Sequence, residues 1–180
     1  VMSGVANGEA QLADPAGEAP RPNYSDTLAA VTAVQRQVEA MDADLAGALR
    51  LVAEQAQSLV RATGSAVAMT DDDPDFMVCR ASAGPDSPPV GARLQVGSGF
   101  SGECVRTGKL LRCDDTETDD RLDQENCRAL GIRSMIAAPV CSRQKTVGIL
   151  EVFSDQPHSF STYDGQVLQR LAETVLAAVN

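Results

Sequence analysis

Five cysteines and one histidine are the side chains of this sequence best suited to nucleophilic or metal chemistry. The cysteines are Cys79, Cys104, Cys113, Cys127 and Cys141. They form an odd set without CxxC spacing, and the lone His158, beside Pro157 in a turn, does not complete a Cys/His zinc site. Cysteine is also commonly a small buried apolar residue, so inert packing is the default interpretation of all five. We therefore expect no catalytic residue and no metal, with reduced thiols in a cytoplasmic protein.

A glycine motif at 97–102 has the GxGxxG spacing that binds the pyrophosphate of a dinucleotide when it joins a strand to a helix. Here only about six residues separate Gly102 from Gly108, whereas a crossover between parallel strands needs about a dozen or more. We therefore interpret the glycines as positions of tight turning and close backbone approach beside a pocket.

Acidic residues crowd the stretch that follows. They are Asp114, Asp115, Glu117, Asp119, Asp120, Asp123 and Glu125. Carboxylate oxygens at such close spacing suit calcium, but the run lacks the glycine and the terminal glutamate spacing of an EF-hand loop. The favoured interpretation is a solvated, mobile loop that covers a pocket.

A long helical pattern over residues 25–63 precedes these motifs. Its apolar positions Val31, Val34, Val38, Met41, Leu45, Ala48, Val52 and Leu59 form a heptad stripe with alternating spacings of three and four, broken at Gln55. This is the stripe of a coiled coil, and it predicts pairing of helices between two chains. The alternative is one or two amphipathic helices packed on the chain's own core, with a break near Met41.

Short apolar runs bounded by turn residues follow, and a helical pattern capped by Ser161 or Thr162 ends the sequence. The order predicts an α+β fold, with an antiparallel sheet of about five to six strands and N- and C-terminal helices packed on one face. We expect a linker at 1–24, dimerisation helices at 25–63 and the core domain at 64–180.

The net charge of −10 disfavours nucleic acid and anionic membranes as partners. The longest apolar stretches, such as Ile136–Cys141, are far shorter than the roughly 18 to 20 residues that cross a bilayer. The first residues also lack the basic and apolar regions of a secretory signal. These features predict a cytoplasmic domain.

Five segments in order resemble the motifs of GAF domains. They are Gly97–Lys109, Asp114–Thr116, Gly131–Val140, Val147–Val152 and Phe160–Asp164. The resemblance implies a GAF/PAS-like fold and a regulatory domain of a bacterial signalling protein, which senses a small molecule, forms a homodimer through its terminal helices and acts on a fused or associated output domain. The ligand contacts that it implies are Phe100, Ser101, Cys104, Cys113, Asp114, Arg133, Ser134 and Ala137.

Departures from the family pattern narrow the function. Ser154-Asp155 and Asp164-Gly165 stand where cyclic-nucleotide-binding members have Asn-Lys and Asp-Glu pairs, and no cysteine has the histidine neighbour of bilin-binding members. We expect no bilin, haem or metal cofactor. One alternative is a GAF scaffold that dimerises and binds nothing.

The enzymatic alternative is a free methionine-(R)-sulfoxide reductase, a GAF-fold enzyme that uses a thiolate. Cys104, Cys113 and Cys127 lie in the segments where that enzyme carries its cysteines, but Ser101 stands at the position of its motif cysteine. Cys104 lies about one helical turn away, roughly 5 Å from that position. This displacement favours a protein that is not an enzyme.

Overall fold

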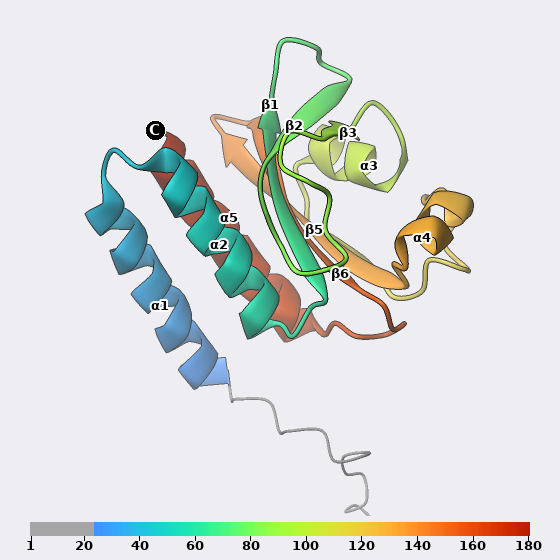
Figure 1. Ribbon diagram of the computed structural model, residues 1–180, viewed down its shortest axis with the longest axis horizontal. Helices are drawn as coiled ribbons and strands as arrows, with labels where there is room; N and C mark the ends of the chain where they lie inside the picture. Colours follow the sequence, from blue (N-terminus) through green and yellow to red (C-terminus); the bar gives the residue numbers. More distant parts are fainter. Residues whose placement is uncertain (1–23) are drawn as a thin grey trace, which may run out of the picture.

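The computed structural model describes residues 24–180, which form five helices and six strands (Figure 1). The elements are α1 (Tyr24–Met41), α2 (Leu45–Leu59), β1 (Gly64–Thr70), β2 (Phe76–Ala83), β3 (Arg93–Gln95), α3 (Gly99–Thr107), β4 (Leu111–Cys113), α4 (Gln124–Leu130), β5 (Ser134–Ser142), β6 (Lys145–Ser154) and α5 (Thr162–Val179). The linker expected at 1–24 falls outside the described residues except for Tyr24, the first residue of α1.

A single antiparallel sheet runs in the order β3-β2-β1-β6-β5-β4. Its centre is the pairing of β1 with β6, in which Val67 lies opposite Leu150 and Ala66 lies opposite Glu151. The sheet, with helices before and after it in the chain, confirms the α+β prediction. All paired strands among the described residues are antiparallel, so the sheet has no parallel pair of the kind that a dinucleotide-binding unit contains.

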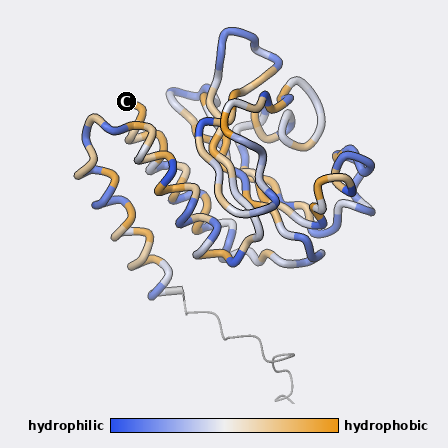
Figure 2. Tube along the Cα trace, viewed as in Figure 1, coloured by the Kyte–Doolittle hydropathy of each residue, from blue (hydrophilic) through white to orange (hydrophobic). Residues whose placement is uncertain are grey.

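The sheet separates two layers of helices. Helices α1, α2 and α5 lie on one side, whereas α3 and α4 lie on the other (Figure 1). Since side chains alternate along a strand, Leu150 and Val152 of β6 pack under the first layer, and Ile149 and Phe153 face the second. Figure 2 shows hydrophilic stretches in connections such as the β1–β2 turn, and alternating hydrophilic and hydrophobic positions along the helices α1 and α2. We call the side beneath α3 and α4 the ligand face, after the ligand contacts that the sequence analysis expects on it, such as Phe100 and Cys104.

Helices α1 and α2 are separate elements, divided where Asp42 adopts a φ of 45° and Asp44 accepts a hydrogen bond from the Gly47 amide at 3.0 Å. Val31, Val34 and Val38 of the heptad stripe are buried within the chain's own core, where α1 contacts α5 and α2. These turns therefore follow the alternative interpretation, in which the helices pack on the chain's own core, because their apolar side is covered by the same chain. A dimer through the terminal helices stays a prediction that must use other faces of those helices.

The last helix begins as predicted. The Ser161 hydroxyl accepts a hydrogen bond from the Asp164 amide at 3.2 Å, and the Asp164 carboxylate accepts one from the Ser161 amide at 2.8 Å. This reciprocal cap satisfies two amides that the helix leaves free. Within residues 24–180, no helix is both long and apolar enough to cross a bilayer.

Candidate functional site

The ligand face carries a second apolar cluster, separate from the one under α2 and α5. Helix α3 contributes Phe100 and Cys104, and α4 contributes Cys127. Small side chains from the central strands form part of the floor, including Ala66, Ala68 and Ala137. Helices α3 and α4 therefore cover a surface of the sheet that has alanines at its centre.

Glu151 places a carboxyl group in the middle of this apolar surface. Glu151 lies on the same face of β6 as Ile149 and Phe153, and its side chain is only 1% exposed. The Ser101 hydroxyl of α3 donates a hydrogen bond of 2.5 Å to Glu151 Oε2. Burial raises the pKa of Glu151 to about 7, although the Ser101 hydrogen bond opposes that rise. The carboxyl therefore changes charge near neutral pH at the centre of the ligand face.

Five of the eight predicted contact residues lie on this face. They are Phe100, Ser101, Cys104, Cys113 and Ala137. Asp114 and Ser134 lie elsewhere, because the pleat turns them to the opposite side from Cys113 and Met135. The Ser134 hydroxyl donates to the Gln156 carbonyl at 2.6 Å, and Asp114 lines a groove beside α5.

Arg133, the last of the eight, lies just before β5. Its guanidinium donates a hydrogen bond of 3.1 Å to Asp115 Oδ1, and its Nε is buried without a hydrogen-bond partner among the described residues. Arg133 therefore ties the acidic loop to the start of β5.

Glu151, in contrast, was not predicted as a site residue. Its signal in the sequence is a single carboxylate inside the apolar run 147–153.

Arginines pair with four carboxylates of the acidic loop, whereas Asp120, Asp123 and Glu125 are exposed to solvent, as expected. The ion pairs are Arg112–Asp114 at 3.1 Å, Arg121–Asp119 at 2.6 Å, Arg128–Glu117 at 2.8 Å and Arg133–Asp115 at 3.1 Å. A hydrogen bond from Arg121 is the main cause that lowers the pKa of Asp119 to about 2. Within residues 24–180, no three Asp, Glu, His or Cys side chains are grouped to hold a metal ion.

Arg121 also connects this loop to α3, the helix that covers the ligand face. Its guanidinium carbon lies 4.8 Å from the centre of the Phe100 ring, a cation–π contact, and its Nη1 lies 4.0 Å from Glu103. Phe100 itself is 3% exposed. The loop therefore covers the first turn of α3, which is the turn that supplies Ser101.

The glycines of the motif act through backbone geometry, as predicted. A Cβ on Gly102 would come within 2.9 Å of the Val96 carbonyl oxygen, so only glycine lets α3 approach the end of β3 this closely. Gly99 begins α3 with a φ of 79°, a conformation that side chains disfavour. The Ser98 side chain makes no capping hydrogen bond, and α3 spans only nine residues.

Four of the five thiols are buried, and all five are unbonded to one another. Burial raises the pKa of Cys104 and Cys113 to about 12, and it also raises the pKa of Cys79 and Cys127. The Cys104 sulfur lies 3.6 Å from the Ala137 carbonyl oxygen. These surroundings favour the thiol over the thiolate, which is the nucleophilic form.

We expect one thiol per folded chain to react quickly with an alkylating reagent at pH 7.5. Cys141 is the exposed cysteine, whereas the other four become accessible only when the structure opens. Mass spectrometry after a timed reaction with iodoacetamide would identify the modified residues, with the urea-unfolded chain as the control. Rapid modification of Cys104, Cys113 or Cys127 in the folded chain would contradict this arrangement.

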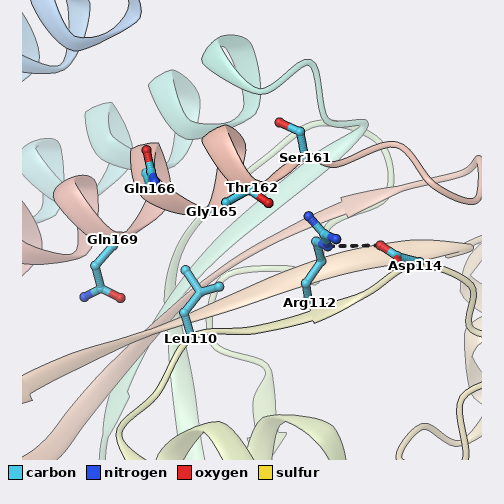
Figure 3. Close-up of a pocket in the computed structure, with 8 residues that line it drawn as sticks. All are labelled: Leu110, Arg112, Asp114, Ser161, Thr162, Gly165, Gln166 and Gln169. Carbon is cyan, nitrogen blue, oxygen red and sulfur yellow. Dashed lines mark ion pairs between the residues drawn. The ribbon is translucent and has the colours of Figure 1, made fainter. Parts of the chain in front are cut away.

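Two surface grooves flank the sheet. One, of about 550 Å³, lies between the β4 segment and the start of α5, where Leu110 and Arg112 face Gly165 and Gln169 (Figure 3). It lies on the side away from the ligand face. The other, of about 520 Å³, is bordered by the β1–β2 and β5–β6 turns. Met77, Val96 and Val105 line this second groove and belong to or pack on the ligand-face cluster.

The second groove, which we call the rim groove, thus reaches the apolar surface beneath α3 from the end of the sheet. Its outer border carries the acidic residues Asp71, Asp72 and Asp73 opposite Lys145. The candidate site therefore consists of a polar pair, Ser101 and Glu151, inside an apolar layer whose edge the rim groove borders; neither residue of the pair lines the groove.

Comparison with known proteins agrees with this fold. The sequence profile of the GAF domain matches residues 42–180. The GAF domain of a phosphoenolpyruvate-protein phosphotransferase from Coxiella burnetii superposes with a TM-score of 0.77 at 21% identity, covering 88% of this chain and 95% of that one. A search of curated proteins finds no match.

Other similar structures differ in function. The free methionine-R-sulfoxide reductase from Neisseria meningitidis, solved with its substrate, has a TM-score of 0.75 at 18% identity and covers 89% of this chain and 92% of that one. The chromophore-binding domain of a bacteriophytochrome from R. palustris has a TM-score of 0.71 at 13% identity, with 89% and 63% covered. At these identities the likeness concerns the fold alone. The profile match spans most of the sequence, so this chain belongs to the GAF domain family.

Proposed function

We propose that this chain is a regulatory domain that binds a small molecule at the ligand face and passes the binding event to the helices on the other side of the sheet. GAF domains are generally sensory or regulatory. The observation that carries the proposal is the buried Ser101–Glu151 pair, because small-molecule sites combine an apolar lining with a few polar groups that orient the ligand.

Strand β6 offers a direct route between the two sides of the sheet. Glu151 faces α3, while its neighbours Leu150 and Val152 are fully buried in the cluster formed with α2 and α5. A ligand that shifts Glu151 therefore also strains the packing under those helices. A ligand with different affinities for two arrangements of the helices would shift the population between them.

The oligomeric part of the proposal is a homodimer through the terminal helices. Since the apolar sides of α1 and α5 are buried within the chain, the dimer would use their outer faces and would leave the core intact. An output domain, fused or associated, would then read the helix arrangement.

A panel of small molecules tests the proposal. We expect at least one compound to shift the ¹⁵N–¹H resonances of Ser101 and Glu151 in a saturable titration and to raise the melting temperature by several degrees at a ligand concentration of about 100 times its Kd. The panel should include neutral, anionic and cationic metabolites. A clear dimer by light scattering, combined with no response to any compound, would instead support the ligand-free scaffold.

We also propose that the domain is not an enzyme, in contrast to the sulfoxide reductase that shares its fold. The supporting observation is that Cys104, Cys113 and Cys127 are all buried, with raised pKa values. Incubation with free methionine sulfoxide and a thiol reductant should give no turnover. Turnover that disappears in Cys127→Ser would overturn this part of the proposal.

A further inference from the structure

Glu151 is a buried acid whose charge nothing in the described structure balances. The ion pairs formed among residues 24–180 do not include it, and the Ser101 hydroxyl is the hydrogen-bond donor to its carboxyl. The other ionisable groups that interact with it are the thiols of Cys79 and Cys104, and both are neutral at physiological pH. Asp164, also buried, is instead explained by its role in the cap of α5.

The space beside this carboxyl is controlled by α3 rather than by the sheet. The residues opposite Glu151 on the neighbouring strands are Ala66 and Ala137, which carry only methyl groups. Above them, α3 is bounded by Gly99 and Gly108, both with positive φ. A ligand that binds directly beside Glu151 would therefore require α3 to move, while the strand pairing of Glu151 with Ala66 and Ala137 could stay unchanged.

We propose that Glu151 and Ser101 form the recognition group for a small ligand that carries a protonated amine, whose N–H groups supply the positive charge that this pocket lacks. The inference rests on the proposed function and adds the chemical class of its ligand. The Glu151 carboxylate would accept hydrogen bonds from the ammonium group, and the Ser101 oxygen offers a second acceptor.

An organic cation fits the surroundings better than a metal ion or a neutral donor. A metal would need further ligands, and no three His, Cys, Asp or Glu side chains are grouped to hold one among the described residues. A neutral donor would leave the buried carboxylate uncompensated, which is costly. An ammonium group on a small apolar body would balance the charge and would place its apolar part against the cluster that contains Phe100 and Cys104.

The charge of the approach favours the same ligand class. The rim groove carries three acidic residues, Asp71, Asp72 and Asp73, against one lysine, and Arg93 pairs with Asp73 at 3.3 Å. The sequence as a whole has a net charge of −10. Both fields raise the local concentration of cations at the groove that leads toward the ligand face.

The test uses methylammonium, ethylammonium and propylammonium chloride as probes of the folded protein at pH 7.5, followed by the ¹⁵N–¹H resonances of Ser101, Gly102 and Glu151. We expect saturable shifts, roughly 10- to 100-fold weaker binding in Glu151→Gln, and roughly 20-fold weaker binding at pH 5.5, where the carboxyl is protonated. Below neutral pH, calorimetry in buffers of different ionisation enthalpy should detect the proton that binding releases.

Matched controls separate the site from the general negative charge. Glu125→Gln removes an exposed acid of α4, and we expect its affinity to stay within about twofold of the parent chain. Tetramethylammonium has the charge without N–H donors and should not saturate. Ser101→Ala keeps the carboxylate and should weaken binding less than Glu151→Gln does.

Equal affinities in the parent chain and Glu151→Gln, or no saturable shift by any amine up to about 200 mM, would overturn the inference. If a neutral or anionic compound shifts the same resonances while the amines do not, the inference fails and the proposed sensing function stands. If no compound of any class does so, both fail.

Discussion

Between pH 4.5 and pH 7, the free energy of unfolding of this domain should fall by about 3 kcal/mol because of one residue, Glu151. In the unfolded chain its carboxyl loses its proton near the usual pKa of 4.5, whereas burial raises the pKa in the folded protein to about 7. The folded state therefore holds a proton that the unfolded state has released across this window. Stability is full below the lower pKa, falls by about 1.4 kcal/mol per pH unit between the two, and is constant above the upper one.

The pairs in the acidic loop act in the opposite sense and at lower pH. Hydrogen bonds lower the pKa values of Asp115, Glu117 and Asp119, so their contribution is present above the usual carboxyl range and is lost as the pH falls through that range. The Glu151 effect can therefore be measured by urea denaturation at closely spaced pH values between 5 and 8, where these three carboxylates stay ionised.

Glu151→Gln is the decisive variant for this slope. The amide has the same shape and no titration, so its stability should be nearly flat over the same interval and should exceed that of the parent chain at pH 8. Glu125→Gln, which removes an exposed acid, should retain the slope of the parent chain. If Glu151→Gln and the parent chain gave parallel profiles, the proton uptake would belong to another group.

The periodicity of apolar residues predicted the sheet and its covering helices, because the pattern within one segment reflects which of its own side chains are buried. The apolar run around Glu151 is buried on both sides, and the caps and glycines near α3 and α5 act within a few residues of chain. The face of the sheet on which a strand residue lies is harder to predict from sequence, since a shift of one residue in the strand register moves every side chain to the opposite face. Asp114 and Ser134 were placed on the ligand face and lie opposite it for this reason.

Contacts between distant parts of the chain could not be inferred from local pattern. The acidic loop carries a negative run in sequence, but Arg112 precedes it, Arg128 and Arg133 follow it, and all three fold back onto its carboxylates. Glu151 is the converse case. Its sequence shows a carboxylate in a strand, and only the tertiary structure shows that α3 brings a single hydroxyl to it.

The heptad stripe of α1 is a further case in which local pattern does not reveal the contact: an apolar stripe does not indicate whether the same chain or a second chain covers it. Replacing Val34 by Glu is expected to destabilise the docking of α1 by roughly 3 kcal/mol or more, because the new carboxylate would be buried between α1 and the chain's own helices. Val34 is 2% exposed. Since the GAF profile begins at residue 42, we expect the sheet and the other helices to remain folded.

Hydrogen exchange measures this docking directly. In Val34→Glu the amides of α1 should exchange much faster than in the parent chain, while those of β1 and β6 keep their protection. Ala33→Glu adds the same charge one residue away at an exposed position, and it should change stability by less than about 0.5 kcal/mol. If Val34→Glu instead kept full protection in α1 and converted a dimer to a monomer by light scattering, α1 would pair between protomers in solution. The intramolecular packing of Val31, Val34 and Val38 would then be the arrangement to abandon.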